Sequence, residues 1–280
     1  MTKTSLIKKN IKLFFQTFEF LLKIILFSNF KLKKELLTIS KRRKNRKIRI
    51  LGNGNSLKKD NFIEKDYDYM VLNNYFLSES YYKIRPLYYL VADPYFFSTE
   101  VGINKIKEIT LITNWEMYLF IPYNKGKNSF FKKMETNYLK ICLYNSSPFE
   151  SFTSIKYLFF DKMLAMPVIQ NVLVGGIMTS IWMEYKTIEL YGVEHSWLGL
   201  LSVDKDNNVY IKDKHFYDKE EVSKTTFKGP DGKQWKLHEV LYAFGRMFES
   251  YWEIDNYIKD KNINIINKSP NSFIDAFKKG

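Results

Sequence analysis

Residues 47–57 of the chain, KIRILGNGNSL, decide the fold, because a short apolar strand runs directly into a glycine-rich turn. Gly52 and Gly54 allow the backbone to approach a ligand closely, and a helix after such a turn can offer its amino end to a phosphate. A tight turn without any ligand is the alternative explanation. Neither a third glycine at dinucleotide spacing nor the lysine of a phosphate-binding loop follows. The motif alone therefore leaves open whether a nucleotide binds.

Segments of similar apolar character follow along the chain, separated by stretches with helical periodicity. We expect strands at 69–73, 87–91, 109–113, 138–143, 187–191 and 263–267, and helices at 176–185 and 237–261. Buried strands that alternate with helices are typical of a doubly wound, mostly parallel sheet. The sequence therefore predicts an α/β domain of the Rossmann-like type over residues 47–280.

The residues directly after these strands are candidate ligand-binding residues, because ligands of doubly wound sheets bind beyond the carboxyl ends of the strands. Most of them are small or carry an amide, which suits hydrogen bonds to a polar ligand. They are Gly52, Asn53, Gly54, Asn55, Ser56, Asn73, Asp93, Ser269, Asn271 and Ser272.

Composition narrows the class of protein. The chain has 280 residues, of which 45% are hydrophobic, and this is enough for a large domain around a core. The single cysteine, Cys142, cannot form an internal disulfide, and three histidines leave little room for a metal site. Asp204 and Asp206 lie in a stretch whose Asp and Asn content favours a tight turn over a metal site. We expect a reduced, cytoplasmic protein with no metal or other cofactor.

The excess positive charge lies at one end of the chain. The net charge is +14, and residues 1–47 hold fourteen Lys and Arg against two acids, Glu19 and Glu35. The remaining residues carry 30 basic and 28 acidic groups, so the body is nearly neutral. A nucleic-acid enzyme more often spreads positive charge along a groove of its body. We therefore expect no nucleic-acid partner.

Residues 1–46 form a basic arm ahead of the α/β domain. Apolar residues recur at helical spacing from Leu6 to Phe30, with lysines between them, which predicts an amphipathic helix. Six cations then follow within residues 41–47. The longest uninterrupted apolar run, 24–27, is far too short to span a bilayer. We expect peripheral attachment to the anionic inner face of the plasma membrane; packing on the body, or on a second copy in a homo-oligomer, is the alternative.

Residues 50–57, ILGNGNSL, resemble the Gly-Asn-Gly-Pro-Ser-Leu opening of the small bacterial sialyltransferases of glycosyltransferase family 42. Further landmarks of that family follow in the same order over residues 47–280. They are Asn73, Asp93-Pro94 with Phe96-Phe97, Gly175-Gly176, Gly192-Val193-Glu194 and Pro270-Asn271-Ser272.

The resemblance implies a Rossmann-like, GT-A-like fold with a lid, which we place at about 197–236. It also implies inverting, metal-independent transfer of sialic acid or a related acidic sugar from a CMP-linked donor. The acceptor would be a surface glycan or a lipid-linked glycan, as in lipopolysaccharide or capsule biosynthesis. Gly175 and Gly176 join the expected donor-binding residues, and His238 stands where the family has its catalytic histidine.

Inverting glycosyl transfer needs a base that takes the proton of the acceptor hydroxyl. His238 is one candidate, because an imidazole titrates near neutral pH. His195, beside Glu194 at a strand end, is the other, and His215 lies in a charged segment that we expect to be solvated. A magnesium-dependent phosphoryl or pyrophosphoryl transferase remains an alternative function. So does a non-catalytic nucleotide-sugar-binding component of polysaccharide assembly.

Overall fold

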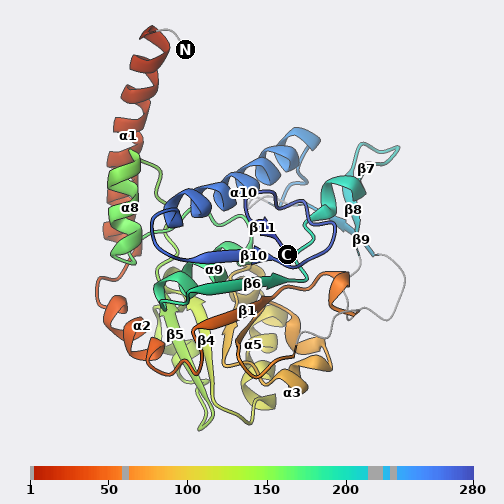
Figure 1. The fold of residues 1–280 in the computed structure, drawn as a ribbon. Coiled ribbons are helices and arrows are strands. Elements are labelled where there is room, and N and C mark those ends of the chain that lie inside the picture. Colours follow the sequence, from red (N-terminus) through yellow and green to blue (C-terminus); the bar gives the residue numbers. More distant parts are fainter. Residues whose placement is uncertain (1–2, 59–62, 214–222, 228–231) are drawn as a thin grey trace.

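The structure, a computed structural model, describes residues 3–58, 63–213, 223–227 and 232–280. Within these residues the central sheet has eight strands: β1 (Lys47–Leu51), β2 (Asp68–Leu72), β3 (Tyr88–Leu90), β4 (Met117–Pro122), β5 (Leu139–Tyr144), β6 (Thr187–Tyr191), β10 (Asn264–Asn267) and β11 (Lys278–Lys279). Their order is β11-β10-β6-β1-β2-β3-β4-β5, and every neighbouring pair is parallel. Helices flank the sheet (Figure 1). The chain is thus an α/β protein with a parallel sheet of the Rossmann-like type.

Helices cover both faces of the sheet, because its strands are apolar on both sides. Ile50 and Met70 point to one face, and Leu51 and Val71 to the other. The first face carries α1 (Lys3–Phe27), α2 (Leu32–Ser40), α8 (Thr153–Asp161), α9 (Val172–Trp182) and α10 (Leu237–Ile258). The second carries η1 (Asn55–Lys58), η2 (Tyr75–Leu77), α3 (Ser80–Ile84), α4 (Tyr95–Ser98), α5 (Glu100–Ile112) and α7 (Ser129–Lys132); α6 (Tyr123–Gly126) directly follows β4.

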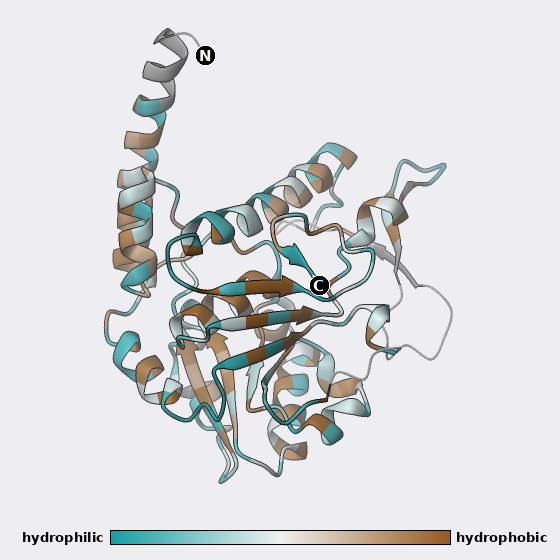
Figure 2. Ribbon diagram, in the orientation of Figure 1, coloured by the Kyte–Doolittle hydropathy of each residue, from teal (hydrophilic) through white to brown (hydrophobic). Residues whose placement is uncertain are grey.

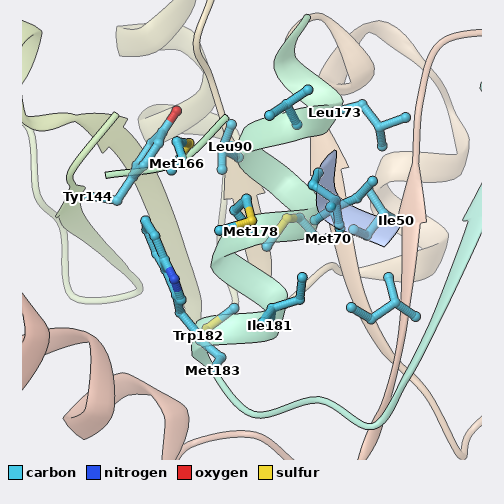
Figure 3. Close-up of a cluster of buried hydrophobic side chains, with 14 of the residues drawn as sticks. Ile50, Met70, Leu90, Tyr144, Met166, Leu173, Met178, Ile181, Trp182 and Met183 are labelled. Carbon is cyan, nitrogen blue, oxygen red and sulfur yellow. The ribbon is translucent and has the colours of Figure 1, made fainter. Parts of the chain in front are cut away.

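Helix α9 lies at the centre of the larger core, against the middle strands of the sheet (Figure 3). Met178 and Ile181 of this helix belong to the same buried cluster as Ile50. A Cβ atom at Gly175 would lie 3.1 Å from the Tyr144 hydroxyl, and one at Gly176 would lie 3.3 Å from Leu72. The two glycines therefore allow the helix to pack closely on the sheet.

One predicted strand is wrong. Residues 109–113, expected as a strand, form the end of α5, and the strand beside β3 is β4 instead. The buried residues Gly102, Ile106 and Ile109 follow helical spacing, and the Thr99 side chain caps the first turn by accepting from the Gly102 N–H. The run at 109–113 is apolar because one side of the helix is buried.

The basic arm is not separated from the body at residue 46. Ile24 of α1, and Leu36 and Ile39 of α2, belong to the larger core. The Thr17 hydroxyl lies 2.8 Å from that of Ser151 and anchors the middle of α1, while the amino-terminal half of the helix extends beyond the body (Figure 1). None of the helices in the described ranges is both long enough and apolar enough to cross a membrane.

The segment between β6 and α10 contains a small antiparallel sheet. The sheet consists of β7 (Leu201–Val203), β8 (Val209–Asp213) and β9 (Ser223–Thr226), and the short helix η3 (Ser196–Leu200) precedes it. The predicted turn at 204–208 is confirmed, since the Asp204 carboxylate accepts from the backbone of Asp206 and Asn208 at 2.9 and 2.8 Å. His215 lies outside the described residues.

Candidate functional site

A cavity of about 510 Å³ opens where the strand order reverses, at the carboxyl ends of β1 and β6. Successive strands continue from β1 toward β5 on one side, whereas β6 lies on the other side of β1. The turns after β1 and β6 therefore leave in different directions, and ligands of doubly wound sheets bind in the resulting crevice. We call this cavity the cleft. It is lined by Gly52, Asn53, Gly54, Asn55, Leu72, Asn73, Asn171, Val172, Leu173, Gly192, Val193, Glu194, His195, Ser196, Trp197 and Leu200.

The glycine-rich turn packs against the turn after β6. The Gly54 N–H donates to the Gly192 carbonyl at 2.9 Å, and the Ser56 N–H donates to the Glu194 carboxylate at 3.0 Å. A Cβ atom at Gly54 would lie only 1.4 Å from Glu194 Oε2. The Ser56 N–H, in a turn that we expect to bind a ligand, is thus already bonded to Glu194.

His195 is the buried titratable group of the cleft. It directly precedes η3 and has a left-handed backbone, and it is almost fully buried. Its Nε2 lies 3.0 Å from the Tyr251 hydroxyl, whereas Nδ1 is buried without a hydrogen-bond partner. Burial lowers the pKa of His195 to about 4, against a smaller opposing effect of the Val193 backbone. The ring is therefore neutral at physiological pH.

Sequence reasoning missed Tyr251, the residue that orients this imidazole. Tyr251 lies on α10, in the buried row that also contains Met247 and Ile254. Nothing in the local sequence distinguishes it from an ordinary core tyrosine. The imidazole contacts Tyr251, whereas the carboxylate of the neighbouring Glu194 contacts Ser56.

The structure does not bring His238 to the cleft. This residue is exposed on the first turn of α10 and is not among the residues that line the cavity. Val240, two positions later, faces the core. Because successive helical residues are about 100° apart, His238 lies on nearly the opposite side of the helix. The histidine that the family resemblance makes catalytic is thus exposed and lies away from the lining of the cleft.

Four asparagines line the cleft: Asn53, Asn55, Asn73 and Asn171. Asn53 donates to the Leu72 carbonyl at 3.2 Å, and its Oδ1 is buried without a partner. Asn73 has a left-handed backbone, and its Oδ1 accepts from the Ala92 N–H at 3.4 Å. The side chain of Asn171 caps α9 by accepting from the Leu173 N–H at 2.9 Å.

The amino end of α9 faces the cleft through Asn171, Val172 and Leu173. The partial positive charge of a helix amino terminus favours an anionic ligand there. Sequence reasoning placed the helix start at 176 and so missed these residues. The available signal was Asn171 itself, an asparagine directly before an apolar run.

The remaining predicted residues lie outside the lining of the cleft, and two serines among them support it. Ser269 Oγ accepts from the Val193 N–H at 2.9 Å, and Ser272 Oγ donates to the Val193 carbonyl at 2.8 Å. Both serines therefore hold the turn after β6. Five other predicted residues also lie outside the cavity lining: Ser56, exposed Asp93, exposed Asn271, and Gly175 and Gly176 in the helix–sheet contact.

An aromatic cavity of about 360 Å³ adjoins the cleft. Trp197 and Asn171 line both, so the two cavities share a wall. The Phe227 and Trp235 rings are nearly parallel with centroids 6.5 Å apart, and Phe244 meets Phe227 edge to face at 5.9 Å. We call this cavity the aromatic pocket.

Within the described residues, no group of three or more His, Cys, Asp or Glu side chains is placed to hold a metal ion. The fold and the cleft define a class: an α/β protein with a cavity at the topological switch point of a parallel sheet. Comparisons of the chain with protein-family models, with curated proteins and with solved structures find no match.

Proposed function

We propose that the protein is a glycosyltransferase that moves an acidic, CMP-activated sugar onto a surface glycan or a lipid-linked glycan. The observation that carries the proposal is the content of the cleft. The amino end of α9, the unpartnered Oδ1 of Asn53 and the neutral, buried imidazole of His195 all lie there, at the switch point of the sheet. Its volume of about 510 Å³ falls in the range of small-molecule sites. The choice of CMP and of an acidic sugar rests on the family resemblance of residues 50–57.

The donor would lie with its phosphate toward the amino end of α9, where the helix dipole stabilises negative charge. The Oδ1 of Asn53 is a buried acceptor that lacks a partner, and leaving such an atom unpaired costs about 1–3 kcal/mol. A hydroxyl or amino group of the nucleoside would supply the missing donor. Asn73 is placed beside it in the same wall.

His195 is the base that this geometry favours over His238. With Nε2–H donating to the Tyr251 hydroxyl, Nδ1 keeps its lone pair for a proton. The acceptor oxygen attacks the anomeric carbon, the bond from that carbon to the phosphate oxygen breaks, and CMP leaves with its electron pair. The hydroxyl proton passes to Nδ1. A bound anionic donor raises the pKa of His195 and so strengthens it as a base.

The acceptor is proposed to enter beside the aromatic pocket. Trp235 and Phe227 are surfaces on which the apolar face of a sugar ring can pack. Nδ1 of His195 is covered in this structure, so η3 must shift for the acceptor hydroxyl to reach it. We propose that the segment at 197–236 acts as this movable cover.

Thermal-shift measurements with CMP, CDP, UDP, GDP and ATP, each with magnesium or with EDTA, test the proposal. CMP is expected to raise the melting temperature without magnesium, since a ligand that binds only the folded form stabilises it. Asn53→Ala should weaken that shift and Asp93→Ala should not. A magnesium-dependent preference for ATP favours a phosphoryl transferase instead. CMP binding without hydrolysis of a CMP-sugar or transfer of its sugar favours the non-catalytic alternative.

A further inference from the structure

One face of α1 is apolar and exposed along the middle and carboxyl-terminal parts of the helix. Between 47% and 68% of each of six large side chains is exposed: Ile11, Phe14, Phe15, Phe18, Leu22 and Ile25. Apart from the neighbours Phe14 and Phe15, they follow one another at spacings of three or four residues, which places them in one stripe, and we call it the α1 stripe. Figure 2 shows apolar residues recurring along this helix among hydrophilic ones. A contiguous exposed patch of aromatic and aliphatic side chains on a folded protein marks an interaction surface.

The α1 stripe cannot turn inward, because the opposite side of the helix is held on the body. Ile24 is fully buried in the larger core, and the Ser28 hydroxyl donates to the Leu164 carbonyl at 2.8 Å. Phe20 packs edge to face on Phe149 with ring centroids 6.2 Å apart. Thr17 makes the hydroxyl contact with Ser151 described above. The stripe is therefore presented outward in a fixed orientation.

Exposed lysines lie on and after the helix that carries the stripe. The first 47 residues carry a net charge of +12, and exposed lysines stand on the helix at Lys12 and after it at Lys31, Lys33 and Lys34. An apolar helix face with cations beside it matches the boundary between the acyl chains and the headgroups of an anionic bilayer. A second copy of the chain would bring the same positive charge to the contact and be repelled.

We infer that α1 docks on an anionic membrane surface, with the α1 stripe inserted among the lipids and the neighbouring lysines at the headgroups. The sequence analysis assigns the membrane contact to residues 1–46 as a separate basic arm. The inference assigns it to the single helix α1, which is anchored to the folded body through Ile24. Strands β1 and β6 point away from α1 toward their carboxyl ends (Figure 1), so docking leaves the cleft uncovered. The inference does not depend on the reaction at the cleft.

Vesicle flotation tests this inference with the full-length chain. The probes are phosphatidylcholine vesicles with and without phosphatidylglycerol. The protein is expected to float with the anionic vesicles, and the triple variant Phe14→Gln, Phe15→Gln, Phe18→Gln is expected to bind them at least about tenfold more weakly. The matched control is Val101→Gln with Leu111→Gln, which changes two side chains that are 60% and 81% exposed on α5. It should float like the unmodified protein.

Two further measurements keep the result interpretable. The melting temperature of the triple variant should equal that of the unmodified protein; a large drop would show that the stripe is a structural surface and overturn the inference. Light scattering reports the oligomeric state. A dimer that the triple substitution dissociates, without vesicle binding by the parent protein, assigns the stripe to a second copy instead. Undiminished flotation of the triple variant also overturns the inference.

Discussion

The Glu194 carboxylate accepts a hydrogen bond from the Ser56 N–H at 3.0 Å and thereby closes over Gly54. The two turns that form the floor of the cleft are thus joined by a side chain of the protein itself. Glycine is required at position 54 because Glu194 fills the space above it. In a sequence, the same glycine is indistinguishable from one that makes room for a ligand.

Gly54→Ala is expected to destabilise the protein by about 2–4 kcal/mol, because its methyl group displaces Glu194 and leaves the Ser56 N–H without its acceptor. Urea unfolding measures the change. Gly245→Ala is the control: no heavy atom lies within 4 Å of its new methyl group, and alanine in a helix interior is favoured over glycine by about 1 kcal/mol. This control should gain stability. Equal effects of the two substitutions would contradict the packing argument.

His195→Ala is expected to lower glycosyl transfer by about 10²- to 10⁴-fold, the usual contribution of general-base catalysis, with donor binding nearly unchanged. His238→Ala should leave turnover within about twofold, because that residue is exposed and away from the cleft. Steady-state kinetics with a CMP-sugar donor provide the measurement. Loss of activity in His238→Ala alone would show that His238 is the base, as the family resemblance implies.

The buried His195 makes stability depend on pH. Its pKa is about 4 in the folded state and close to the ordinary 6.5 when unfolded, so between these values the unfolded chain binds the extra proton. The stabilisation is complete above pH 6.5 and is lost as the pH falls toward 4, with a loss of about 2 kcal/mol by about pH 5. Urea midpoints of the protein and of His195→Asn measure it. The variant should show a smaller decrease; identical pH profiles would exclude His195 as the cause.

Trp235→Ala is expected to raise the KM for the acceptor by about tenfold through loss of a stacking surface, while the KM for the donor stays unchanged. Trp252→Ala is a matched control, since Trp252 is half exposed on α10 and does not line the aromatic pocket. Kinetics with one substrate varied at a time separate the two effects. A change in the donor KM alone would show that Trp235 contacts the donor and not the acceptor.

Arg49 and Glu189 form a buried ion pair between neighbouring strands, at 2.9 Å and in the same register. Arg49→Met is expected to cost about 3–5 kcal/mol, because Glu189 is left charged in the core. The double variant with Met at both positions should recover much of this loss. Chemical unfolding of the three proteins tests it. If the double variant is no more stable than Arg49→Met, the uncompensated charge is not the main cost.

Local pattern was sufficient for most of the fold. Six of the seven expected strands and the long helix lie within three residues of β1, β2, β3, β5, β6, β10 and α10, since continuous apolar runs mark strands that are buried on both faces. Residues 109–113 were wrongly predicted as a strand, because a run of five apolar and small residues is too short to show helical periodicity. Only the buried positions before it, Gly102 and Ile106, show the helical spacing.

The sequence predicted which turns form the candidate site, but not which of their side chains line it. The turns after β1, β2 and β6 could be located, because parallel strands deliver their carboxyl ends to one edge of the sheet. Ser269 and Ser272 were located at a strand end as well, yet they support Val193 from behind and do not line the cleft. A position along a strand indicates which edge a residue occupies, and it does not indicate which way the side chain points after the strand has ended.

The sequence by itself determined the strand–helix alternation, the glycine-rich turn at the first strand and the concentration of positive charge in the first 47 residues, since each is a property of neighbouring residues. The tertiary structure alone decided that Glu194 closes over Gly54, that Tyr251 holds His195 and that Ile24 anchors α1 with its apolar stripe outward. The physical reason is separation along the chain. These contacts join residues brought together only by packing of the sheet and its helices, and local pattern carries no record of which distant side chain completes a contact.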